Sequence, residues 1–169
     1  MWLRYADRPR LQLTPSGLDK GLQLAGAVLL AVFLVVVAAS WTLLPASLPV
    51  HFSLSGEPES WGERGEILLL PVIASLQFVL LSVLARFPHR HNYPVSITAA
   101  NAEQQYRLAQ RLLHVLSLLL VLLFFALYLA TWAVASHVLA RLPVLVMWLP
   151  LAAIGALLVW YWLRARQAR

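Results

Sequence analysis

The sequence predicts an all-α integral membrane protein with four transmembrane helices in a bundle. Hydrophobic residues make up 61% of the 169 residues, and charged residues make up only 12%. Soluble domains average about 45–50% apolar and about 25% charged residues. The chain also contains four apolar stretches, each long enough to cross a hydrocarbon core about 30 Å thick as a helix. We therefore expect residues 1–169 to form a single membrane domain.

The four predicted spans cover residues 21–44, 67–85, 112–135 and 142–163. They have to be helical because hydrocarbon offers no water to satisfy an open backbone. The first stretch is much longer than the apolar core of a signal peptide, which has about 7–15 residues, so we interpret it as an uncleaved anchor. Pro150 lies inside the fourth stretch and is expected to kink it. Ala152, Gly155 and Ala156 follow, and they are expected to allow close helix approach.

The basic residues predict the orientation of these spans. Two of the thirteen Lys and Arg residues, Arg64 and Arg141, follow the first and third spans. The other eleven lie in the N-terminal segment, in the connection 86–111 and at the C-terminus: Arg4, Arg8, Arg10, Lys20, Arg86, Arg90, Arg107, Arg111, Arg164, Arg166 and Arg169. Because cytoplasmic flanks are enriched in Lys and Arg, we expect both termini and the connection 86–111 to be cytoplasmic, an N-in/C-in topology. The net charge of +6 is then a topology signal, so we expect membrane lipids as partners and no nucleic acid.

The external loop, residues 45–66, is expected to be ordered against the external ends of the helices. It contains four of the seven acidic residues: Glu57, Glu59, Glu63 and Glu66. The alternation from Pro49 to Ser53 favours an extended segment, and Ser55-Gly56 predicts a turn. Trp61 is expected to lie at the membrane interface, where aromatic residues gather.

Within this loop the stretch LPVHFSLSGEP, residues 48–58, is followed by Trp61-Gly62. This pattern resembles the bacterial domain-of-unknown-function family 1648. That family has a histidine two residues after a proline, then an aromatic residue and a glycine, between its first two membrane helices. A second stretch, residues 92–106, with Asn92, Asn101 and Tyr106, is similar to the segment that leads into the third helix of the family.

The resemblance implies a multi-pass protein of the bacterial cytoplasmic (inner) membrane. Its best-known members are immunity proteins of the SdpI type, which protect a cell from its own secreted killing factor. We therefore expect a non-enzymatic binding or protective protein that recognises a peptide, a lipid or another membrane protein through the external loop. The alternative is a small transporter or channel component. None of the four spans carries an acid, a lysine or an arginine in its interior, which favours the first interpretation.

The candidate ligand or partner residues are His51, Phe52, Glu57, Trp61, Asn92 and Asn101. A histidine near the interface can bind a ligand or sense pH. His51 can equally be structural, with its ring hydrogen-bonded to a loop carbonyl or a glutamate. Asn101 or Thr98 is expected to cap the third helix, with Gln104 completing a capping box after Asn101. That helix is expected to begin before the membrane, at the headgroups.

The sequence lacks the residues that several kinds of catalytic and metal sites require. It contains no cysteine, which excludes disulfides, thiolate metal sites and iron–sulfur clusters. Phosphate-binding glycine loops, nucleophile elbows and zinc-protease motifs are missing too. His51 and the loop glutamates show no metal-ligand spacing. We therefore expect no enzymatic activity, no metal and no cofactor.

Overall fold

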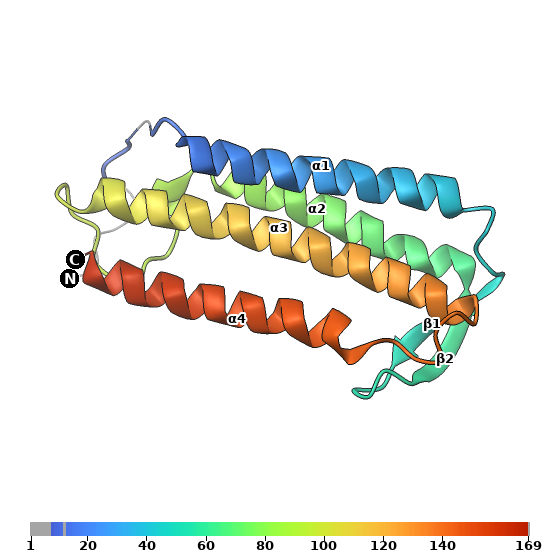
Figure 1. The fold of residues 1–169 in the computed structure, drawn as a ribbon. Helices are drawn as coiled ribbons and strands as arrows, with labels where there is room; N and C mark the ends of the chain where they lie inside the picture. Colours follow the sequence, from blue (N-terminus) through green and yellow to red (C-terminus); the bar gives the residue numbers. More distant parts are fainter. Residues whose placement is uncertain (1–7, 12, 169) are drawn as a thin grey trace.

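Four long apolar helices account for most of the chain (Figure 1). The computed structural model describes residues 8–11 and 13–168. The helices are α1 (Gly17–Ser40), α2 (Leu69–Leu84), α3 (Ala102–Ala135) and α4 (Val144–Gln167). The remaining elements are strands β1 (Ser47–Phe52) and β2 (Pro58–Glu63) and the short 3₁₀ helices η2 (Arg64–Leu68) and η3 (Pro88–Arg90).

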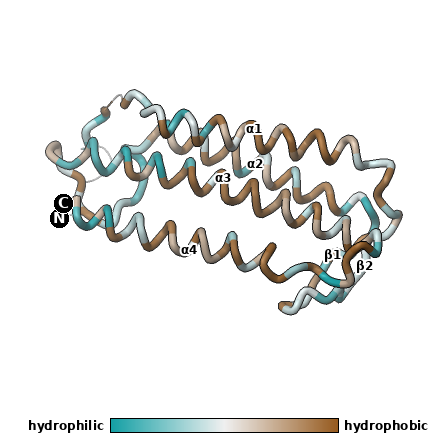
Figure 2. Tube along the Cα trace, viewed as in Figure 1, coloured by the Kyte–Doolittle hydropathy of each residue, from teal (hydrophilic) through white to brown (hydrophobic). Residues whose placement is uncertain are grey.

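All four helices are long and apolar enough to cross a membrane, by length and composition. The best 18-residue windows have mean hydropathies of 2.7, 2.6, 2.7 and 2.1 in chain order. Figure 2 shows hydrophobic residues along the helices and hydrophilic residues gathered at the two ends of the molecule. The protein is therefore a multi-pass membrane protein. Arg4 and Arg169, used above for the orientation, lie outside the described residues.

The central helix of the arrangement is α3, which packs against α1, α2 and α4. The start of α1, the end of α4 and the connection 85–101 lie at one end of the molecule, which we call the basic end (Figure 1). The strands lie at the other end, which we call the hairpin end (Figure 1). Because α4 makes its main helix contact with α3, most of its surface stays outside the core.

The core between α1 and α3 is built on aromatic rings. Phe33 and Tyr128 are both fully buried. Phe33 stacks on Phe125 with 4.9 Å between ring centroids. The Tyr128 hydroxyl lies 2.6 Å from the hydroxyl of Ser40, which satisfies both polar groups within an apolar surrounding. Such paired hydroxyls are a usual way of joining membrane helices.

The basic end is closed by side chains of α3 that bind backbone carbonyls. Gln105 is fully buried, and its Nε2 donates to the carbonyls of Ala165 and Ala168 at 2.8 and 2.9 Å. These carbonyls belong to the last turn of α4 and to the residue that follows it, where helical partners run out. The Tyr106 hydroxyl donates to the Pro9 carbonyl at 3.0 Å. The N-terminal arm (residues 8–11 and 13–15) and the end of α4 are thus both attached to α3.

The expected early start of the third helix is confirmed, because α3 begins at Ala102, ten residues before the predicted span. Thr98 and Asn101 exchange reciprocal bonds just before it: the Thr98 N–H donates to Asn101 Oδ1 at 2.8 Å, and the Asn101 N–H donates to Thr98 Oγ1 at 3.3 Å. The expected capping box with Gln104 is wrong, since the Asn101 side chain bonds back to the loop instead.

The prediction for the small residues of α4 is also wrong within the described chain. Ala152, Gly155 and Ala156 are exposed, and a Cβ added at Gly155 would meet no atom within 4 Å. They lie on a face of α4 that no other described helix covers. Pro150 lies within α4 and is buried, and the helix continues past it to Gln167.

Candidate functional site

The loop of residues 45–66, which the sequence predicts to be external, forms an antiparallel β-hairpin of β1 paired with β2. The predictions that this loop is ordered and contains an extended segment are confirmed. The pairing of that segment with a second strand was not predicted. Leu48 and Pro49 on β1 are buried, and Leu48 joins the core that contains Phe33 and Tyr128. β1 therefore anchors the hairpin to the helices, and β2 is the outer strand.

Gly56 fixes the turn of the hairpin. Its φ of +87° belongs to the left-handed region that glycine adopts without steric cost. Its carbonyl accepts a hydrogen bond of 2.9 Å from the N–H of Leu142, just before α4. An added Cβ would lie 2.0 Å from the Leu142 carbonyl oxygen. The turn is thus held tightly against the segment that leads into α4, and this contact requires glycine.

His51 lies on β1 with its ring exposed. Its Nδ1 lies 2.8 Å from the hydroxyl of Ser60, the residue opposite it on β2. The partner expected for a structural role was a carbonyl or a glutamate, so the observed partner differs from that prediction. A serine hydroxyl can both donate and accept, so this bond tolerates either tautomer of the imidazole.

A cavity of about 300 Å³ lies beneath the hairpin, between β1, the start of α2 and α3. His51 and Phe52 contribute to its wall together with Glu66 and Thr131. The other lining residues are apolar: Leu48, Pro49, Val50, Ile67, Leu69, Leu70 and Leu127. Two of the candidate residues thus face one largely apolar space with a few polar groups, the usual composition of a small-ligand site.

The outer strand carries an acidic face with an aromatic centre. Glu59, Trp61 and Glu63 alternate along β2 and are all exposed, whereas the residues between them are half-buried. Trp61 is 50% exposed. Glu57 lies nearer the turn, and its Oε1 is 3.8 Å from Nη1 of Arg141. Within residues 8–11 and 13–168, no group of three or more His, Asp or Glu side chains is arranged to hold a metal ion.

Asn92 and Asn101 lie at the basic end, so the six candidate residues do not form one site. Asn101 is buried, and its Nδ2 donates to the Ser96 carbonyl at 3.0 Å, which gives it a structural role. Asn92 is exposed, and its neighbours His91 and Tyr93 are each held by a hydrogen bond to a backbone carbonyl. His91 Nε2 donates to the Leu84 carbonyl at 3.0 Å, and burial lowers the pKa of this imidazole. Burial also raises the pKa of the Tyr93 hydroxyl, which donates to the Pro88 carbonyl at 2.8 Å.

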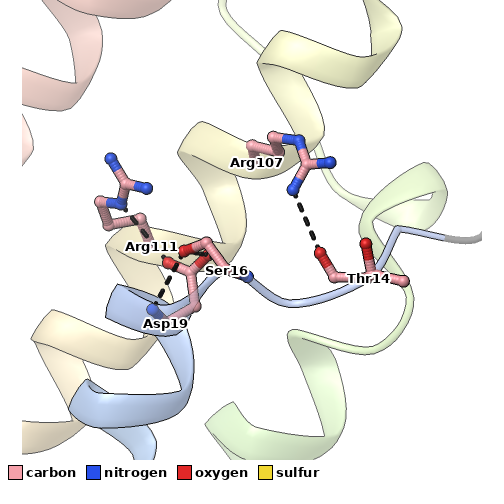
Figure 3. A network of polar contacts seen from close by, with 5 residues as sticks. All are labelled: Thr14, Ser16, Asp19, Arg107 and Arg111. Carbon is pink, nitrogen blue, oxygen red and sulfur yellow. Dashed lines mark hydrogen bonds and ion pairs between the residues drawn. The ribbon is translucent and has the colours of Figure 1, made fainter.

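Asp19 is an important polar residue that sequence reasoning missed. Its side chain is only 3% exposed. Figure 3 shows it in the first turn of α1 beside α3, where its carboxylate accepts from the Ser16 hydroxyl at 2.6 Å and lies 3.4 Å from Arg111 Nε. The sequence did carry a signal, because Ser16 followed three residues later by an acid before an apolar run is typical of a capping box. Nearby, Arg107 donates to the Thr14 carbonyl at 3.2 Å (Figure 3).

The comparison with protein families bears directly on the hairpin. Residues 28–74 match the family model "Domain of unknown function (DUF1648)". The match runs from the middle of α1 through the hairpin into α2, and it contains His51, Phe52, Glu57 and Trp61. The predicted resemblance to domain-of-unknown-function family 1648 at residues 45–66 is therefore confirmed, and residues 92–106 lie outside the matched segment.

The chain is also similar to an uncharacterised protein of Archaeoglobus fulgidus, with 31% identity over 93 residues. This similarity covers 50% of the present chain and 49% of the relative, so the chain spans about half the length of the curated relative it matches. No solved structure matches the chain. These comparisons fit a multi-pass membrane protein of an uncharacterised family.

Proposed function

We propose that this protein is a non-enzymatic protein of the bacterial cytoplasmic membrane that binds a cationic, partly apolar peptide through the outer face of its hairpin. The orientation deduced from the basic residues would place the hairpin outside the cell, where a secreted peptide arrives. The proposed role is protective or accessory, as in the immunity proteins that the loop resembles. The single observation that carries the proposal is the exposed series Glu59, Trp61 and Glu63 on β2.

The acidic residues of the hairpin and its exposed aromatic ring both support a cationic ligand. Residues 45–66 contain four glutamates and one arginine, Arg64, whose guanidinium lies over the Trp41 ring. A half-exposed indole between two carboxylates attracts a lysine or arginine side chain by cation–π and ionic interaction together. Leu54, in the turn of the same hairpin, is 75% exposed and offers an apolar contact. The anchoring of β1 and Gly56 holds this surface rigid, which lowers the entropy cost of binding.

The test uses the full chain in nanodiscs of phosphatidylcholine, whose neutral headgroups leave the peptide no competing charge. The probe is a synthetic amphipathic peptide of lysine and leucine, and the control peptide carries glutamate in place of lysine. Binding is measured by calorimetry at low and high salt. We expect the lysine peptide alone to bind, with an affinity that falls as salt screens the carboxylates.

Two variants test the surface itself. Glu59→Gln with Glu63→Gln is expected to weaken binding about fivefold to tenfold, and Trp61→Ala at least about tenfold, as central aromatic contacts do. Glu103→Gln at the basic end is the matched control and should leave binding unchanged. Equal binding of both peptides, or equal loss in the control, would rule the proposal out.

The transport alternative predicts a different result. The cavity beneath the hairpin and a larger one at the basic end, described below, are separated along α3 by the Phe33–Phe125 stack. Ion or solute flux in liposomes that contain only this protein would favour transport over peptide binding. We expect no flux.

A further inference from the structure

A cavity of about 640 Å³ lies at the basic end of the molecule. It is bounded by the N-terminal arm, by α1, α2 and α3, and by the connection after α2. Its polar and basic lining residues are Arg10, Gln23, Ser82, Arg86, His89, Gln110 and His114. The apolar ones are Leu11, Leu13, Pro15, Ala85, Phe87 and Pro88.

The packing of α1 against α2 leaves this space open. Gly26 of α1 lies against the Phe78 ring of α2 so closely that an added Cβ would lie 3.0 Å from it. One turn nearer the basic end, Gln23 on α1 and Ser82 on α2 line the cavity. Gln110 and His114 of α3, one turn apart, lie on its wall. The cavity is therefore a gap between α1 and α2 that begins below the Gly26–Phe78 contact.

Three polar side chains that line this cavity make no hydrogen bond to the described part of the protein. Among the described residues, Gln23, Ser82 and His114 make no hydrogen bond, whereas Gln110 donates to the Ala85 carbonyl at 2.9 Å. The three side chains are half-buried at the ends of apolar spans, so a molecule that enters the cavity can reach their polar atoms. An amide, a hydroxyl and an imidazole can all donate, so together they suit a ligand rich in acceptor oxygens.

The charged residues that line the cavity favour an anionic ligand. Arg10 and Arg86 line it, and neither forms an ion pair within the described chain. The cavity has no acidic lining residue among those described. The nearby carboxylate of Asp19 is already engaged by Ser16 and Arg111. Two guanidinium groups with free donors are a typical setting for a phosphate.

We propose that this cavity binds the phosphate-bearing headgroup of an anionic phospholipid. Arg10 and Arg86 would hold the phosphate, and Gln23, Ser82 and His114 would donate to the headgroup hydroxyls and ester oxygens. Two features favour a lipid over a free anion. The space is far larger than a phosphate ion needs, and nearly half of its lining residues are apolar, which suits the first carbons of the acyl chains. The cavity also lies where basic residues meet the apolar spans, at the depth of the headgroups.

The test measures lipid retention by native mass spectrometry on the full chain, supplied with equimolar phosphatidylglycerol and phosphatidylcholine. We expect phosphatidylglycerol to be retained at least tenfold more than phosphatidylcholine by the unaltered protein. Arg10→Ala with Arg86→Ala should abolish this preference. The matched control, Arg164→Ala with Arg166→Ala, removes the same charge from the same end but outside the cavity, and it should keep the preference.

Further arms separate the possible sources of the phosphate. Millimolar glycerol phosphate or inorganic phosphate should not displace the lipid, and displacement by either would overturn the lipid assignment. Equal loss of preference in both double variants would overturn the site, because general charge attraction would then explain retention. Gln23→Leu keeps every charge and should still lower retention several-fold. If it has no effect, the cavity is not the site.

Discussion

Replacing Gly56 by alanine is expected to detach the hairpin from the segment before α4 and to lower the free energy of unfolding by about 3–4 kcal/mol. Two causes add. Alanine is strained at a φ of +87°. Its Cβ would also lie 2.0 Å from the Leu142 carbonyl oxygen, a backbone atom that cannot rotate away. The hydrogen bond from Leu142 to the Gly56 carbonyl is then lost as the segments separate.

The effect is measured by thermal unfolding in detergent, followed by tryptophan fluorescence, and by hydrogen exchange over residues 53–60. Gly65→Ala is the matched control, because an added Cβ there meets no atom within 4 Å and the backbone needs no positive φ. We expect the control to change the unfolding free energy by less than about 0.5 kcal/mol. If both variants behaved alike, the close contact between the hairpin and Leu142 would be contradicted.

The second large effect is expected for Asp19→Ala, which should lower the free energy of unfolding by about 2–3 kcal/mol. The change removes the capping box with Ser16, so two donors at the start of α1 lose their acceptor. It also leaves Arg111 without its carboxylate partner. Since the Arg111 side chain is 35% exposed, water offsets part of that second loss.

Glu103→Gln provides the control for Asp19. Glu103 also pairs with an arginine of α3, Arg107, at 2.9 Å, but its side chain is 62% exposed. Exposed pairs one helical turn apart contribute about 0.3–0.5 kcal/mol, so the control should be nearly neutral. Urea or SDS unfolding curves of the two variants test the comparison. A loss as large in Glu103→Gln as in Asp19→Ala would show that burial is not what makes Asp19 important.

The helices were predictable because the pattern that encodes them is long and local. Stretches without charge predict spans, and the structure places helices at all four. The ends were less predictable because they depend on polar contacts. α1 begins at Gly17, earlier than expected, since Ser16 and Asp19 cap it there. α3 also begins before its predicted span, because reciprocal hydrogen bonds between Thr98 and Asn101 fix the backbone just before its first turn.

The site could be predicted only in part. The loop around His51 was identified because its residues form a recognisable local pattern. The alternation of Glu59, Trp61 and Glu63 is also local, but its meaning depends on the pairing of β2 with β1, which the sequence did not indicate. The cavity at the basic end escaped prediction altogether. It joins Arg10, Ser82 and His114, which are far apart in the sequence and meet only through helix packing.

The most direct test of the account is the side of the membrane on which each end lies. The chain has no cysteine, so single substitutions give unambiguous labelling. Ser55→Cys probes the hairpin end and Gln104→Cys the basic end, and both positions are exposed. A membrane-impermeant maleimide added to intact cells should label Ser55→Cys at once and Gln104→Cys only after lysis. Labelling of Gln104→Cys in intact cells, with Ser55→Cys protected, would contradict the proposed orientation and the function built on it.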